Sequence, residues 1–104
     1  MCGYLFAQNP DEIEIAAWRV EVVQFCRENG FRLRSMFIDR GSTGDEVRRP
    51  GLSGLLDVLR LPDTHGVVVP HPEHLSADEE KLDSLCEAIR RTGSKVIYMN
   101  RDGG

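Results

Sequence analysis

The sequence has no excess of positive charge. Its 104 residues include 13 lysines and arginines against 17 aspartates and glutamates, which gives a net charge of -4 at pH 7. Binding to nucleic acid depends on lysine and arginine side chains that neutralise phosphates. The composition therefore argues against a chain that holds DNA by itself, and we expect its own DNA binding to be weak or absent.

Long hydrophobic runs and a signal-peptide pattern are also missing. No apolar stretch approaches the roughly 20 residues of a membrane-spanning helix. Cysteine is scarce, and its three copies, Cys2, Cys26 and Cys86, form no C-x-x-C pair. An odd number of thiols without a signal peptide is typical of the reducing cytosol. We expect a cytoplasmic protein with free, buried thiols and no contact with membranes.

The hydrophobic pattern predicts alternating strands and helices within a single domain, residues 1–104, with 100–104 as a flexible tail. Apolar runs predict strands at 3–7, 33–38, 67–69 and 96–99, and the segments between them have helical spacing. Strands that alternate with helices form a mostly parallel sheet covered on both faces. The sequence therefore predicts a three-layer α/β/α fold with a four-stranded sheet.

Each predicted helix has residues suited to its ends. Asn9 is the expected N-cap of the first helix, with Pro10 at its first position, and Ser76 with Glu79 reads as a capping box for the third. Gly30 and Gly93 are expected to end these two helices. The buried face of the first helix is predicted to comprise Ile15, Trp18, Val22 and Phe25. Trp18 is expected in the core, or half-buried at an interface.

A block in the middle of the chain carries a family resemblance. F-I-D at 37–39, S-T-G at 42–44 and R-P-G-L at 49–52, followed by two leucines at 55–56, is similar to the F-x-D…S-G…R-P-x-L-x-x-L-L signature of the serine recombinase (resolvase and invertase) catalytic domain. The segment 67–76 resembles that family's V-V…L-D-R-L-S-R strand and loop. The resemblance implies a resolvase-like fold with the flavodoxin-like strand order 2-1-3-4.

The chain departs from this family where the chemistry takes place. In the family, a serine after the first strand attacks a DNA phosphodiester, and several arginines stabilise the charge that develops on the phosphate. The serine position falls at Gln8 and an arginine position at Phe6, while two later arginines fall at His74 and Ala77. No serine at all precedes Ser35. We therefore expect no catalytic residue and no strand cleavage by the family mechanism.

Several polar residues remain at the ends of the predicted strands, where ligands bind in such folds. They would form a vestigial pocket, made of Gln8, Asp39, Ser42, Arg49, Glu73 and His74. Two interpretations stay open: a relict anion pocket, or, as we favour, a structural role in which Asp39 accepts backbone N–H groups and pairs with Arg49. His71 and His74 beside Glu73 suggest a metal site less than a solvated loop. We expect no metal and no cofactor.

Three functions compete. The first, which we favour, is a degenerate recombinase-like domain that acts as an interaction or regulatory module, as a homodimer or as a partner of another protein. The second is an active recombinase domain within a longer or split protein, since the chain has no counterpart of the family's long dimerisation helix and DNA-binding domain. The third is a small flavodoxin-like domain that binds an anion or a nucleotide.

Overall fold

A computed structural model describes residues 1–7, 11–40, 50–76 and 78–99 of the chain. Along these ranges the predicted alternation of strands and helices is confirmed, with one additional short 3-10 helix, η1. The elements are β1 (Cys2–Ala7), α1 (Glu12–Glu28), β2 (Ser35–Arg40), α2 (Pro50–Leu59), β3 (Gly66–Val69), η1 (Pro72–His74), α3 (Glu79–Arg91) and β4 (Lys95–Tyr98).

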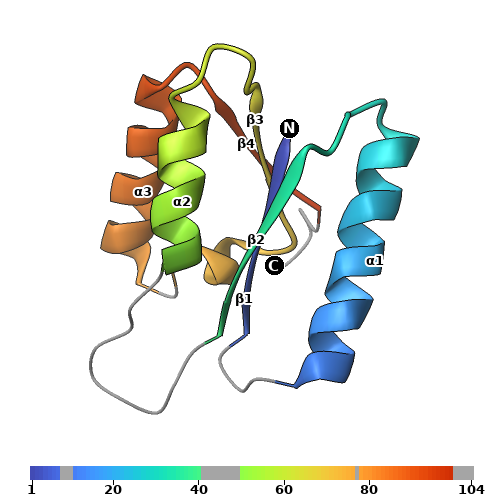
Figure 1. The fold of residues 1–104 in the computed structure, drawn as a ribbon. Coiled ribbons are helices and arrows are strands. Elements are labelled where there is room, and N and C mark those ends of the chain that lie inside the picture. The colour runs from blue at the N-terminus through green and yellow to red at the C-terminus, as the bar shows by residue number, and fades with distance from the viewer. Residues whose placement is uncertain (8–10, 41–49, 77, 100–104) are drawn as a thin grey trace.

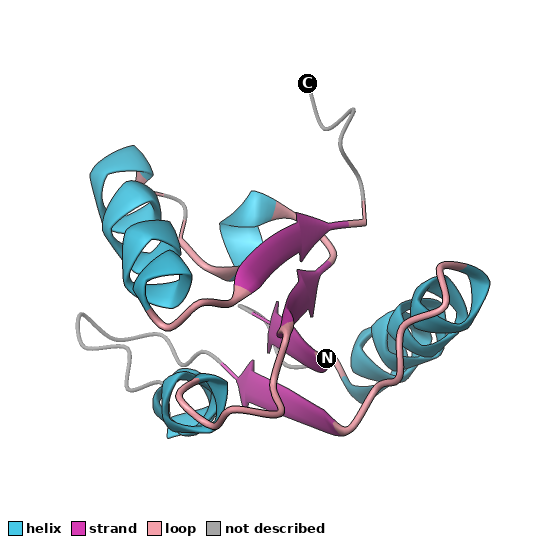
Figure 2. Ribbon diagram, turned by 90° about the horizontal axis from the view of Figure 1, so that it is seen from above, coloured by secondary structure: helices cyan, strands magenta, loops and turns pink. Residues whose placement is uncertain are grey.

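The four strands form one parallel sheet in the order β2-β1-β3-β4, as expected from the resemblance. Strand β1 is aligned with β2 over six residue pairs, but with β3 over only two. Helix α1 covers one face of the sheet, and α2 and α3 cover the other (Figures 1 and 2). The three-layer α/β/α architecture is therefore confirmed. Within the described part of the chain, no helix is long and apolar enough to cross a bilayer.

Each face of the sheet has its own hydrophobic core, because neighbouring side chains of a strand point to opposite faces. Tyr4 of β1 belongs to the core under α2 and α3, whereas Leu5 belongs to the core under α1. The predicted free, buried thiols are confirmed for all three cysteines. Burial raises the pKa of the Cys2 and Cys26 thiols, which keeps them protonated at neutral pH.

The predicted N-caps of the first and third helices are wrong. Helix α1 begins at Glu12, and the side chain of Asp11 accepts a hydrogen bond from the backbone N–H of Ile13 at 3.0 Å, so neither Asn9 nor Pro10 starts the helix. Helix α3 is capped by Asp78, whose carboxylate accepts from the N–H groups of residues 80 and 81. Ser76 instead accepts from the N–H of Asp78 at 3.1 Å. An ionised aspartate next to the helix is the stronger acceptor at the positive end of the dipole.

Two further boundaries bear on the site. Strand β2 lies two residues later than predicted, so that Asp39 is inside the strand and not after it. The glycines expected at helix ends are confirmed, with φ of +74° at Gly30 and +88° at Gly93. Trp18 is half-buried on α1 and packs against the core on that side of the sheet.

Candidate functional site

The most buried carboxylate of the described residues lies near the end of β2. Asp39 is only 2% exposed. Its Oδ1 accepts a hydrogen bond from the backbone N–H of Gly51 at 2.7 Å, and its Oδ2 accepts from the N–H of Leu52 at 2.9 Å and from the hydroxyl of Tyr4 at 2.7 Å. Three donors from two different elements thus converge on a single carboxylate.

These contacts make Asp39 a cap for α2 that is supplied from another part of the chain. The first N–H groups of a helix have no partner within the helix, and a negative charge there is favoured by the helix dipole. Gly51 allows the approach, since a Cβ at this position would lie 2.9 Å from Oδ1 of Asp39. The carboxylate accepts backbone N–H groups, as the structural interpretation requires. Its expected partner Arg49 lies outside the described residues, as do Gln8 and Ser42.

The second polar feature is a histidine held against the end of β1. His74 closes the 3-10 helix η1, and its Nδ1 accepts a hydrogen bond from the backbone N–H of Phe6 at 3.0 Å. Its ring forms a T-shaped contact with the ring of Trp18 at a centroid distance of 5.4 Å and stacks on the ring of His71 at 6.3 Å. Burial, and then the charge of His71, lower the pKa of His74 to about 4. The imidazole is therefore uncharged at neutral pH.

The expectation of a solvated loop is wrong for His74, which is half-buried and bonded to the sheet. Glu73 beside it is exposed. Among the described residues, no three His, Cys, Asp or Glu side chains are grouped so that they could hold a metal ion. The histidine contacts were missed because nothing in the sequence links Trp18 to η1. One signal was available: Pro72 begins a 3-10 turn, which places residues three apart on the same side.

Asp39 and His74 meet at the same edge of the sheet but belong to different layers. Phe6 is paired in register with Asp39 and gives its N–H to His74, so it lies between them. The Asp39 side chain bonds to α2, however, while the His74 ring packs on Trp18 of α1. The arrangement ties three layers together rather than pointing two functional groups at a common ligand.

Among the described residues at this edge, an arginine is also engaged. Arg40, the last residue of β2, forms an ion pair with Glu12 at the start of α1, with N–O distances of 2.8 and 3.1 Å. This hydrogen bond lowers the pKa of Glu12 and raises that of Arg40. Both side chains are exposed, so the pair adds little stability. It does reduce the positive charge available to a phosphate at the carboxyl ends of the strands.

A cavity lies at the opposite edge of the sheet, where the strands begin. It has a volume of about 740 Å³, and its charged lining consists of the basic residues Arg32, Arg34 and Lys95 and the acidic residue Asp63. Arg34 immediately precedes β2 and Lys95 is the first residue of β4. Because the strands are parallel, their amino ends meet here and bring the basic residues to one side of the molecule.

Comparison with known proteins finds a matching family model and solved structures with the same architecture. Residues 8–103 match the family model described as the resolvase N-terminal domain. No curated protein matches the sequence at a significant level. Among solved structures, the catalytic domain of ISC1926 TnpA, an IS607-like serine recombinase, superposes with a TM-score of 0.83 at 15% identity, over 99% of this chain and 69% of that one.

Two other solved structures show the same fold. The catalytic domain of TP901-1 integrase gives a TM-score of 0.78 at 15% identity and covers 96% of this chain and 78% of that one. A resolvase family site-specific recombinase from Streptococcus pneumoniae gives 0.78 at 16% identity, with 100% and 74% covered. At such low sequence identity, the superpositions show a shared fold and nothing about function.

Proposed function

The chain belongs to the resolvase N-terminal domain family of serine recombinases, and from this premise we propose that it has lost DNA cleavage and acts as an interaction or regulatory module. Positions that hold catalytic residues in the family hold other residue types in this sequence. Cleavage needs a nucleophile and preorganised positive charge around the phosphorus. The described residues at the corresponding positions serve the fold instead.

The observation that carries the proposal is the state of His74. This residue stands at the position of a family arginine, a permanently charged group with five donors. Here the imidazole uses Nδ1 to accept from the N–H of Phe6, packs on Trp18 and has a pKa of about 4. It carries no charge at pH 7 and cannot stabilise a phosphorane as a guanidinium does. Loss of one such donor typically costs about 10²–10³ in rate.

Two neighbours support the same conclusion. Phe6 stands at another arginine position, and its ring packs against the core under α2 and α3. The acid that the family motif retains, Asp39, is buried, and three donors bind its two oxygens. The site therefore offers no described cation for a phosphate other than the paired Arg40.

An assay with supercoiled plasmid DNA tests the proposal. The purified chain is incubated with the plasmid beside an active serine recombinase as a positive control, and the products are analysed for nicks and for protein covalently bound to DNA. We expect neither product from this chain. A covalent adduct that disappears in the Ser42→Ala variant would overturn the proposal, because it would reveal a working nucleophile.

A second candidate function is supported by the basic cavity at the amino edge of the sheet. Arg32, Arg34 and Lys95 at one side of an acidic protein could hold an anion such as a phosphate or a nucleotide. A ligand that binds only the folded chain raises its melting temperature. Thermal unfolding with phosphate and with nucleotides, compared between the wild type and Arg34→Ala, separates this function from a pure interaction module. No shift with any of them would exclude it.

A further inference from the structure

A cavity of about 420 Å³ lies between α1 and the segments that follow β3 and β4. Its apolar lining comprises Trp18 and Phe25 of α1, Pro70 after β3, and Met99 after β4. Trp18, Phe25 and Met99 are half-buried and pack against the core on this side of the sheet, so their remaining surface lines the cavity. The N–H of Met99 donates a hydrogen bond to the carbonyl oxygen of Val69 at 3.0 Å, which joins the two segments.

The rim of this cavity is acidic. Glu21 and Glu28 are exposed, and each follows one of the two aromatic residues of α1 by three positions. Residues three apart are neighbours on one face of a helix, so each ring has a carboxylate beside it. The pair of aromatic residue and glutamate recurs after two turns of α1, which separates the two pairs by about 10 Å.

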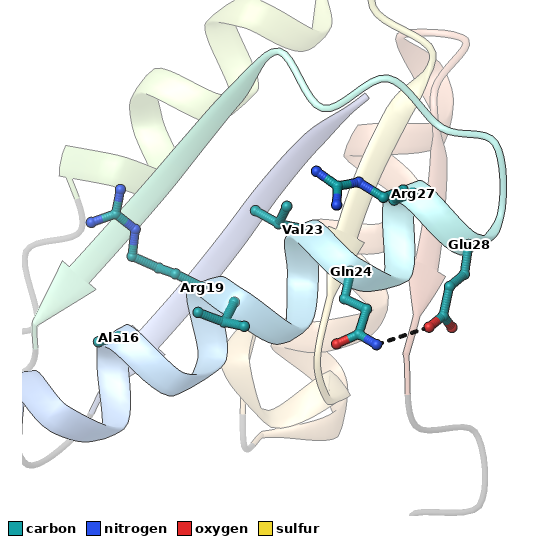
Figure 3. A pocket seen from close by; sticks show the side chains of 7 residues that line it. Ala16, Arg19, Val23, Gln24, Arg27 and Glu28 are labelled. Carbon is teal, nitrogen blue, oxygen red and sulfur yellow. Dashed lines mark hydrogen bonds between the residues drawn. The ribbon is translucent and has the colours of Figure 1, made fainter.

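The two carboxylates have no cationic partner in the described part of the chain, where the ion pairs involve other glutamates. Glu28 accepts a hydrogen bond at 3.0 Å from the uncharged amide of Gln24, which positions the carboxylate without cancelling its charge. Figure 3 shows this bond on one side of α1, with Arg19 and Arg27 reaching to the other side. The rim therefore keeps two negative charges beside an aromatic wall.

We propose that this cavity binds a basic segment of a partner protein, in which two arginine side chains lie about 10 Å apart. This rests on the proposed role as an interaction module and states the chemistry of its partner. A cation is attracted by the face of an aromatic ring, and a carboxylate beside the ring adds a charge-assisted hydrogen bond. Arginine suits both groups, because its planar guanidinium stacks on rings and binds carboxylates.

The spacing of the two pairs selects the conformation of the segment. In a polyproline II helix, three residues make one turn and each adds about 3.1 Å, so side chains three residues apart point to the same side about 9 Å apart. Grooves lined by aromatic side chains are also the surfaces that bind such segments. A small organic cation, by contrast, occupies one pair at a time. The pairs are partly exposed, so the binding is weak and falls with added salt.

Titration of the full chain with a short synthetic peptide tests the proposal. The peptide is acetylated and amidated and has two arginines separated by two prolines. Calorimetry measures its affinity, and the fluorescence of Trp18, the single tryptophan of the sequence, reports whether it occupies this cavity. We expect saturable binding that changes this fluorescence. Glu21→Gln/Glu28→Gln should raise the dissociation constant about three- to tenfold, because both charged contacts are lost.

Glu80→Gln/Glu87→Gln is the matched control. It removes the same net charge from α3, which covers the other face of the sheet (Figure 2), and should bind the peptide as the wild type does. Circular dichroism establishes that both double variants are folded. A peptide with glutamines in place of the arginines should not bind. A peptide with one proline between the arginines should bind more weakly, because its arginines no longer point to the same side.

Binding that is absent, that leaves the fluorescence of Trp18 unchanged, or that weakens equally in both double variants would overturn the site. Ethylguanidinium separates a segment from a free small cation. If it binds as tightly as the peptide, the occupant is a small organic cation and the proposed segment is wrong. The plasmid assay is independent of these measurements, so cleavage of DNA would overturn only the proposed loss of activity.

Discussion

Asp39 shows how much of the fold can depend on one buried carboxylate. Its oxygens bind two N–H groups of α2 and the hydroxyl of Tyr4. All three groups are donors, so the acceptor-only character of an ionised carboxylate suits them. An amide in its place would direct its own N–H groups at another donor.

We therefore expect Asp39→Asn to lower the free energy of unfolding by about 2–3 kcal/mol, because at least one buried donor loses its acceptor. Urea denaturation followed by circular dichroism measures the loss. Tyr4→Phe is the control, since it removes one hydrogen bond and leaves the capping of α2 in place, at a cost of about 1 kcal/mol. A variant Asp39→Asn as stable as the wild type would show that the cap contributes nothing.

His74 should make stability depend on pH. Its pKa is about 4 in the folded chain and near 6.5 when unfolded, so the unfolded state binds the proton more tightly. The contribution of the neutral ring is complete above about pH 6.5 and is lost as the pH falls towards 4. Between pH 7 and 4.5 the wild type should lose about 1–2 kcal/mol more than His74→Gln, a value reduced for the solvent that reaches the ring.

Urea denaturation at the two pH values measures this difference. The exposed His65 provides the control, because His65→Gln should retain the pH dependence of the wild type. If His74→Gln and the wild type respond equally to acid, the histidine is not held in its neutral form by the fold.

The elements of this fold follow from local sequence patterns, and their ends do so less well. The continuous β-branched run at 67–69 is typical of a strand covered on both faces, and the leucines of α2 have helical spacing. Both elements lie where the sequence predicts them. Acidic residues accumulate at the starts of α1 and α3, so several neighbours compete as N-caps and the sequence cannot choose among them. Helix geometry selects Asp11 and Asp78.

The site was predictable only in part, for the same physical reason. Asp39 stood out because a motif contains it, and a capping role needs only nearby N–H groups. The bond between His74 and Phe6 joins residues 68 positions apart in the sequence. No local pattern contains such a contact, because it depends on the order of the strands.

At the level of elements, the backbones of β3 and β4 approach each other closely at Gly66. A Cβ on Gly66 would overlap the carbonyl oxygen of Lys95 and lie 3.0 Å from its nitrogen. Both atoms belong to the backbone of a paired strand and cannot move away. We expect Gly66→Ala to cost about 3 kcal/mol, or to prevent folding.

Gly30→Ala provides the comparison for this strand, since nothing lies within 4 Å of a Cβ there and only its positive φ is strained. Its expected cost is about 1 kcal/mol. Thermal unfolding of both variants gives the order directly. An equal loss in the two would mean that the strands can separate to admit a methyl group.

At the scale of the whole molecule, the order of the strands divides the sheet between the two parts of the sequence. The first part of the chain supplies β2 and β1, and the second supplies β3 and β4. Only two residue pairs join β1 to β3. The bonds from Asp39 to α2 and from Phe6 to His74 cross the same boundary. Asp39, Phe6 and His74 therefore join one half of this protein to the other.

It follows that the polypeptide can be divided without dividing the domain. Fragments 1–44 and 45–104, produced together, should assemble into a complex whose circular dichroism spectrum matches that of the intact chain. Each fragment contributes a pair of strands, and the hydrogen bonds between the two halves need no covalent link. Asp39→Ala in the shorter fragment should abolish this reassembly. The two fragments would then recognise each other as separate molecules, without a peptide bond between them.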